Sequence, residues 1–227
     1  MKYNIIQIEN TLFTMDGQLS KNPIGRRMIV IRLSNNELVV HSPIHLEGAL
    51  KSELDSLGEL TTILVPNKWH TLEVKKVHAQ YPHSKIFVSD GLQKEFSKRF
   101  PIYGTYEEDW IVPLSDELDV FSIEGLHNPE VVFFHKESKT LIVADVFFNF
   151  NHNDCSGFTK LLMLLNKATQ FGTTRLYKWS MVKDKSLFKA SLEDILKKWT
   201  IDKIIVCHGH IIHTNGMIKI QNAINNL

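Results

Sequence analysis

Three potential metal ligands stand beside apolar runs of this sequence. They are His127, ahead of the run 131–134, Asp145, which closes the run 140–144, and His208, which follows the run 204–207. A polar side chain at the end of a buried strand lies at the rim of a sheet, where rigid backbone positions it and solvent reaches it. Imidazole and carboxylate groups bind zinc, and three of them leave a coordination position for water. These residue types and positions therefore predict a metal centre that activates water.

The length and composition are those of an ordinary globular chain. The 227 residues are 43% hydrophobic and 22% charged, which favours one large domain over two. The net charge of +1 gives no basic or acidic field, so neither nucleic acid nor a membrane is indicated as a partner. Cys155 and Cys207 have no CxxC spacing, and we expect a reducing, cytoplasmic setting. No stretch approaches the roughly 20 apolar residues of a membrane span, and no signal peptide is visible.

The first half of the chain alternates predicted strands with predicted helices. The strands are expected at 28–33, 38–40, 62–65 and 86–88, and the helices at 47–57, 69–80 and 92–96. The first two strands flank a turn signal at Asn35-Asn36 and predict a hairpin. The remaining order of strand, helix, strand and helix is typical of a mostly parallel sheet with covering helices.

The second half is rich in β-structure before helices return. Strands are expected at 110–112, 118–121, 131–134, 141–148 and 204–207, and helices at 158–170, 186–199 and 217–225. Ser191 with Asp194 resembles a capping box, so a helix that begins there is an alternative. Two β-rich halves that each carry helices predict an α/β sandwich of two sheets, formed by residues 1–227 as a single domain.

Six short segments together resemble the metallo-β-lactamase fold superfamily, the αββα sandwich hydrolases. They are residues 27–33, 40–44, 65–70, 81–82, 130–135 and 141–150. Their order and spacing extend the resemblance from about residue 10 to about residue 212. Within the superfamily, the chain most resembles a poorly characterised bacterial and plant family, filed as a domain of unknown function. The resemblance implies a four-layer αββα sandwich.

The resemblance also implies a reduced set of metal ligands. In the superfamily, a His-x-His-x-Asp-His run holds most of two metal ions, but the corresponding loop here, 66–71, has only His70 as a strong ligand. His70, Asp145 and His208 would bind one zinc or iron ion, with His127 as a possible fourth ligand. A bound metal lowers the pKa of water to about 7. We therefore expect hydrolysis of an ester, thioester, amide or phosphodiester of an unknown small molecule, with Asp145 and His70 as catalytic residues.

Other interpretations of these residues stay open. Any one histidine at a strand end is more often a hydrogen-bonded imidazole than a ligand. Because the His-x-His-x-Asp-His run is missing, a catalytically decayed fold that binds a small molecule or a protein is the alternative function. For the remaining candidates near the site we expect a structural role, a role in positioning a ligand, or simple solvation: His41, His45, His152, Asp154, His210, His213 and Cys207. We expect His78, His83 and His135 on the surface.

Overall fold

The structure, a computed structural model, describes residues 4–18, 25–110, 114–151, 153–154 and 157–227. Contacts divide the chain into two compact units. The described residues of the first unit are 4–18, 25–110 and 114–116, and those of the second are 117–151, 153–154 and 157–227. The single-domain organisation stays a prediction. No helix in these described ranges is long and apolar enough to cross a membrane.

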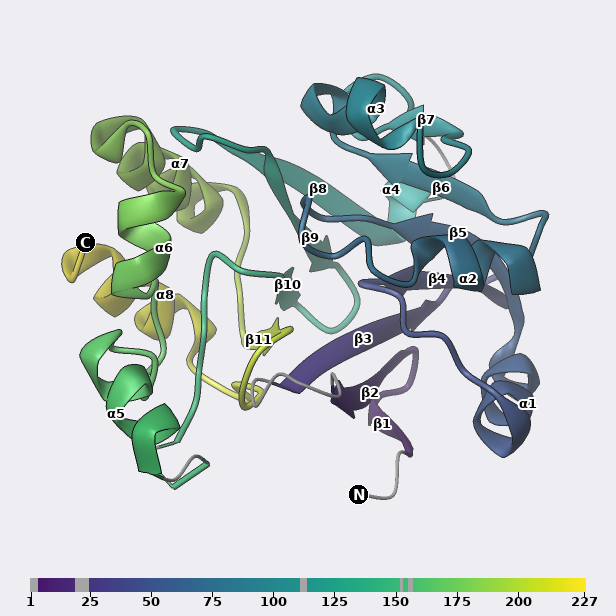
Figure 1. Ribbon diagram of the computed structural model, residues 1–227, viewed down its shortest axis with the longest axis horizontal. Coiled ribbons are helices and arrows are strands. Elements are labelled where there is room, and N and C mark those ends of the chain that lie inside the picture. The colour runs from purple at the N-terminus through teal and green to yellow at the C-terminus, as the bar shows by residue number, and fades with distance from the viewer. Residues whose placement is uncertain (1–3, 19–24, 111–113, 152, 155–156) are drawn as a thin grey trace. The chain divides into compact units, whose positions relative to one another are not determined.

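The first unit contains, in its described part, a seven-stranded sheet in the order β1-β2-β3-β4-β5-β6-β7 (Figure 1). Its strands are β1 (Ile5–Glu9), β2 (Leu12–Gln18), β3 (Gly25–Arg32), β4 (Glu37–His41), β5 (Glu59–Leu64), β6 (Lys85–Val88) and β7 (Gly104–Thr105). Strands β1 to β4 pair antiparallel and β4 to β7 pair parallel. Parallel neighbours need crossovers, which here contain α1 (Gly48–Leu57), α2 (Val74–Gln80) and α3 (Asp90–Phe96). The predicted hairpin and the predicted parallel pairing are both confirmed.

Helices α1, α2 and α3 cover one face of this sheet. Met28 and Val30 lie two residues apart on β3, so their side chains point to the same face. They share one buried cluster with Leu54 of α1, Val77 of α2 and Phe96 of α3. Burial of apolar surface, worth about 25 cal/mol per Å², therefore holds the three helices on the sheet.

The loop that carries His70 is a turn rather than the start of a helix. The Oδ1 atom of Asn67 accepts the backbone N–H of Trp69 at 2.8 Å and that of His70 at 3.3 Å. An asparagine that binds the backbone two and three residues ahead favours a turn. The helix predicted for 69–80 is thus wrong at its start, because α2 begins only at Val74.

The second unit contains, within its described residues, a four-stranded sheet in the order β11-β10-β9-β8. The elements that follow the short helix α4 (Leu114–Glu117) are β8 (Leu118–Ile123), β9 (Glu130–His135), β10 (Thr140–Val143), α5 (Gly157–Leu165), α6 (Arg175–Ser180), α7 (Lys185–Lys198), β11 (Lys203–Val206) and α8 (Gly216–Asn225). β10 pairs antiparallel with β9 and parallel with β11. Tyr177 of α6, Phe188 of α7 and Ile220 of α8 share a buried cluster with Val143 and Val206 of the sheet.

Three sequence predictions for this unit are wrong in detail. The strand predicted for 141–148 ends at Val143, because a carboxylate takes the backbone N–H groups of the next residues. The helix predicted for 158–170 ends at Leu165, and α6 was not predicted. His135 is buried at the end of β9, where its Nδ1 lies 2.7 Å from Ser138 Oγ. The strand predicted for 110–112 lies largely outside the described residues, and Trp110 itself is not in a strand.

The alternative helix start at Ser191 is also wrong. The carboxylate of Asp184 accepts the backbone N–H groups of Ser186 and Leu187, at 2.9 and 3.0 Å. This side chain caps α7, which therefore begins at Lys185. Ser191 lies inside the helix, where its hydroxyl accepts the backbone N–H of Glu124 at 3.0 Å.

Candidate metal centre

Asp145 and His208 lie together because β10 and β11 are parallel neighbours. Val143 pairs with Val206, and the two potential ligands each follow two residues later. The N–H of Cys207 donates to the carbonyl of Val143 at 3.1 Å, which keeps the two strand ends in register. The rim of one sheet therefore positions both side chains, as the sequence predicted.

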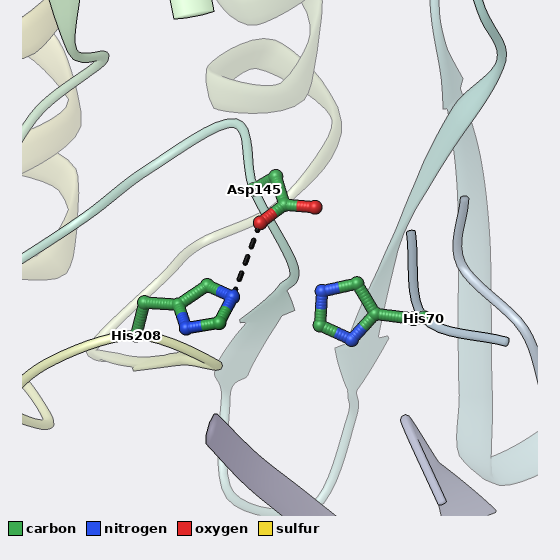
Figure 2. A group of neighbouring side chains, drawn as sticks. All are labelled: His70, Asp145 and His208. Carbon is green, nitrogen blue, oxygen red and sulfur yellow. Dashed lines mark ion pairs between the residues drawn. The ribbon is translucent and has the colours of Figure 1, made fainter. Parts of the chain in front are cut away.

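The two ligand atoms are close enough to share one ion. His208 Nε2 lies 3.2 Å from Asp145 Oδ1, and the two side chains are only 15% and 11% exposed (Figure 2). Two donors on a tetrahedral zinc, each about 2.1 Å from the metal, lie about 3.4 Å apart. The aromatic ring of Phe148 stacks on the His208 imidazole, with ring centres 5.4 Å apart and planes 13° from parallel. The pair thus fits two adjacent positions around a single metal ion.

A buried carboxylate, Glu130, holds the turn that carries Asp145. Its Oε1 atom accepts the backbone N–H groups of Asp145 and Val146, both at 2.7 Å, and its Oε2 atom accepts the hydroxyl of Tyr177 at 2.8 Å. Burial, together with the negative charge of Asp145, raises the pKa of Glu130 to about 7. Burial and the adjacent Glu130 likewise raise the pKa of Tyr177. A cation bound by Asp145 would offset the repulsion between the two carboxylates.

Sequence reasoning did not give Glu130 a functional role. The only signal was an acidic residue directly before the apolar run 131–134. The register that pairs Ile142 with Phe133 continues toward a position where Glu130 faces Asp145. That register could not be read from the sequence, and the positioning role of Glu130 follows from it.

Gly209 determines how closely the His208 loop approaches the loop after Asp145. Its φ is +107°, and a Cβ atom there would lie 2.2 Å from the carbonyl oxygen of Asn149. The N–H of Asn149 donates to the carbonyl of His208 at 3.2 Å, so the two loops pair through their backbones. Only glycine combines this φ with this contact.

We expect Gly209→Ala to lower the free energy of unfolding by about 2–4 kcal/mol and to displace His208. Chemical denaturation would measure the loss. Gly48→Ala is the matched control, because Gly48 also has a positive φ, +55°, but nothing lies within 4 Å of the added Cβ. Equal losses in the two variants would show that φ alone, and not the contact with Asn149, accounts for the glycine.

His70 belongs to the first unit. It is half-buried in the turn that Asn67 caps. Its imidazole is of a type that binds transition metals, and its place in one ligand set with Asp145 and His208 stays a prediction. In the first-unit loop, the ammonium group of Lys68 lies 4.7 Å from the centre of the Trp69 ring, and the Trp69 side chain is exposed.

The other candidates have different surroundings. His127 is exposed, and its backbone N–H donates to the carbonyl of Met181 at 2.8 Å. His210 Nε2 lies 2.9 Å from Asp154 Oδ2, on the surface. His41 is buried with its Nδ1 3.1 Å from Ser42 Oγ. Cys207 is buried. His152 and Cys155 lie outside the described residues. The role of His127 as a fourth ligand stays a prediction.

Comparisons with known proteins agree with this fold. The model of a family described as a domain of unknown function, DUF4336, matches residues 10–175. DIM-1 metallo-β-lactamase is similar in structure, with a TM-score of 0.69 and 14% identity over 100% of this chain and 98% of that chain. A metallo-β-lactamase from Pontibacter korlensis is similar with a TM-score of 0.66 and 10% identity over 100% of both chains. One from Hirschia baltica has a TM-score of 0.64 and 10% identity over 99% and 97%. No curated protein matches the chain. The chain therefore has the metallo-β-lactamase fold.

Proposed function

Because the chain belongs to the DUF4336 family of unknown function, and has the metallo-β-lactamase fold, we propose that it is a metal-dependent hydrolase with one ion held by His70, Asp145 and His208. The observation that carries the proposal is the 3.2 Å approach of His208 Nε2 to Asp145 Oδ1 at the ends of two parallel strands. Two imidazoles and one carboxylate suit zinc, and also suit ferrous iron.

The loop 66–71 supports one ion rather than two. Lys68 is a cation that lies over an aromatic ring, so it is not a ligand. The side-chain oxygen of Asn67 accepts two backbone N–H groups of its own turn. His70 is then the residue of this loop with a ring nitrogen suited to a transition metal.

The residues of the proposed centre would share the work with the ion. A bound ion would supply Lewis acidity and lower the pKa of water to about 7, so that hydroxide is available at neutral pH. Glu130 and the strand end fix Asp145, whose carboxylate would hold the ion and orient the water beside it. Stacking on Phe148 fixes the orientation of the His208 ring, and the hydrogen bond from the Asn149 N–H fixes the position of the His208 backbone. The substrate is proposed to be a small molecule with an ester, thioester, amide or phosphodiester bond.

A hydrolysis assay tests the proposal. Chelator-treated protein would be reconstituted with zinc or ferrous iron and given p-nitrophenyl acetate, an acyl thioester and bis(p-nitrophenyl) phosphate. We expect metal-dependent hydrolysis of at least one compound, and a loss of at least about 100-fold in kcat/KM for His70→Ala. His213→Ala is the control, because His213 is an exposed histidine on the loop that follows His208. Metal-independent rates for all three compounds, or an equal loss in the control, would contradict the proposal.

The alternative function is a binding or regulatory module on a decayed hydrolase fold. The stacking of Lys68 on Trp69, where the superfamily has its first histidines, favours it. The two functions differ in one measurable property, because a decayed module needs no transition metal to keep its activity or its stability.

A further inference from the structure

Helix α5 of the second unit exposes all four of its leucines. Leu161, Leu162, Leu164 and Leu165 are between 40% and 55% exposed, and Met163 is the buried residue among the described side chains of this helix. Met163 packs in a small cluster with Phe150 and Ala168. An exposed apolar patch of this kind on a soluble domain marks a binding surface.

Helix α6 follows α5 in the second unit, and both lie on the left of Figure 1. The N–H of Arg175 donates to the carbonyl of Asn166 at 3.0 Å, and its guanidinium donates to the carbonyl of Leu165 at 3.2 Å. On α6, Leu176 is 57% exposed and Trp179 is 83% exposed. We call the exposed leucines of α5, with Leu176 and Trp179, the α5–α6 face.

The segment that carries this face is rich in basic residues and lacks acidic ones. Between Asp154 and Asp184 the chain has five basic residues and no acidic residue, although its whole net charge is only +1. The five are Lys160, Lys167, Arg175, Lys178 and Lys183. Among the described ion pairs, none includes any of them. The charge is therefore available to an external anion.

Four cations also line one hollow beside Trp179. Arg175, Lys178, Lys183 and Lys185 surround a cavity of about 350 Å³. Burial and the charges of neighbouring cations lower the pKa of Lys178, which shows how closely the positive charges gather. A cavity of this size and charge suits a phosphate-bearing group.

We propose that the α5–α6 face binds the surface of an anionic lipid bilayer, with the leucines and Trp179 in the headgroup region and the basic residues on lipid phosphates. Helices that lie in a membrane interface combine an apolar face that includes leucine and tryptophan with lysine and arginine around it. Charge complementarity selects anionic lipid over a neutral surface, because each basic residue near an anionic bilayer strengthens binding about fivefold. A water-soluble substrate would not need six exposed apolar side chains on an outer pair of helices.

Vesicle sedimentation tests this surface with the full-length protein. We expect binding to phosphatidylcholine vesicles that contain about a third phosphatidylserine, and little binding to phosphatidylcholine alone. Lys167→Glu with Lys183→Glu should weaken binding at least about 25-fold, since two cations are lost. Leu161→Ser with Leu165→Ser should abolish it. Both pairs are exposed, so we expect the variants to keep the melting temperature of the wild type.

Ile218→Ser with Lys219→Glu is the matched control, because it changes an exposed apolar residue and an exposed lysine on α8. This control should bind vesicles as the wild type does. Equal binding to neutral vesicles, no binding to anionic vesicles, or unchanged binding in the two test variants would overturn the proposal. A dimer in the absence of lipid that the leucine substitutions dissociate would also overturn it, because a second copy of the chain would then cover the face.

Discussion

Replacement of Glu130 by alanine is expected to lower the free energy of unfolding by about 3–5 kcal/mol. The carboxylate accepts two backbone N–H groups and one hydroxyl in a site that is 2% exposed. Alanine would leave all three donors buried without their acceptor, and it would open a cavity beside Tyr177. Urea denaturation followed by tryptophan fluorescence would measure the change.

Glu130→Gln is the matched variant. Its amide oxygen can accept the N–H groups of Asp145 and Val146, and its NH₂ group can donate to the Tyr177 hydroxyl if that hydroxyl turns. Since burial raises the pKa of Glu130 to about 7, the neutral glutamine resembles a state that the acid itself reaches. We expect a loss below about 1.5 kcal/mol. If Glu130→Ala also lowered the free energy of unfolding by less than about 1.5 kcal/mol, the positioning role of Glu130 would be refuted.

The second large effect is expected at Asp145. Zinc at about 100 times its dissociation constant should stabilise the wild type by about 2.7 kcal/mol, because the ion binds only the folded chain. Asp145→Asn removes the anionic ligand and should remove this stabilisation. The metal-free variant should be about as stable as the metal-free wild type, since the substitution also relieves the repulsion between Asp145 and Glu130. Thermal melting with and without zinc would measure both quantities.

Asp154→Asn provides the comparison for this experiment. Asp154 also pairs with a histidine, His210, at 2.9 Å, but the His210 side chain is 52% exposed, whereas that of His208 is 15% exposed. The zinc-dependent rise in melting temperature should persist in this variant. The same rise in Asp145→Asn would place the zinc site elsewhere on the chain.

The sequence was sufficient to place Asp145 and His208 each at the end of a strand, and the structure adds that the two strands are parallel neighbours. Both residues close apolar runs, and neighbouring parallel strands bring their carboxyl ends to one edge of a sheet. Helix α7 was predicted from the helical spacing of its apolar residues, and strands β8 and β9 were predicted from short β-rich segments. The metallo-β-lactamase fold came from the order of several weak segments together.

Three features of the fold could not be predicted from the sequence, each for its own physical reason. Strand β10 ends where Glu130, ten residues before that strand begins, takes the next N–H groups. Helix α6 has six residues, which is too short for a periodic pattern. The exposed leucines of α5 look in sequence like a buried helix face, because periodicity shows that a face is apolar and not what covers it.

Elemental mass spectrometry of the protein purified without chelator tests the central claim most directly. The proposed centre predicts about one equivalent of zinc or iron in the wild type, and a loss of that metal in Asp145→Asn. Less than about a tenth of an equivalent of any transition metal in the wild type, with no gain of stability on zinc addition, would contradict it.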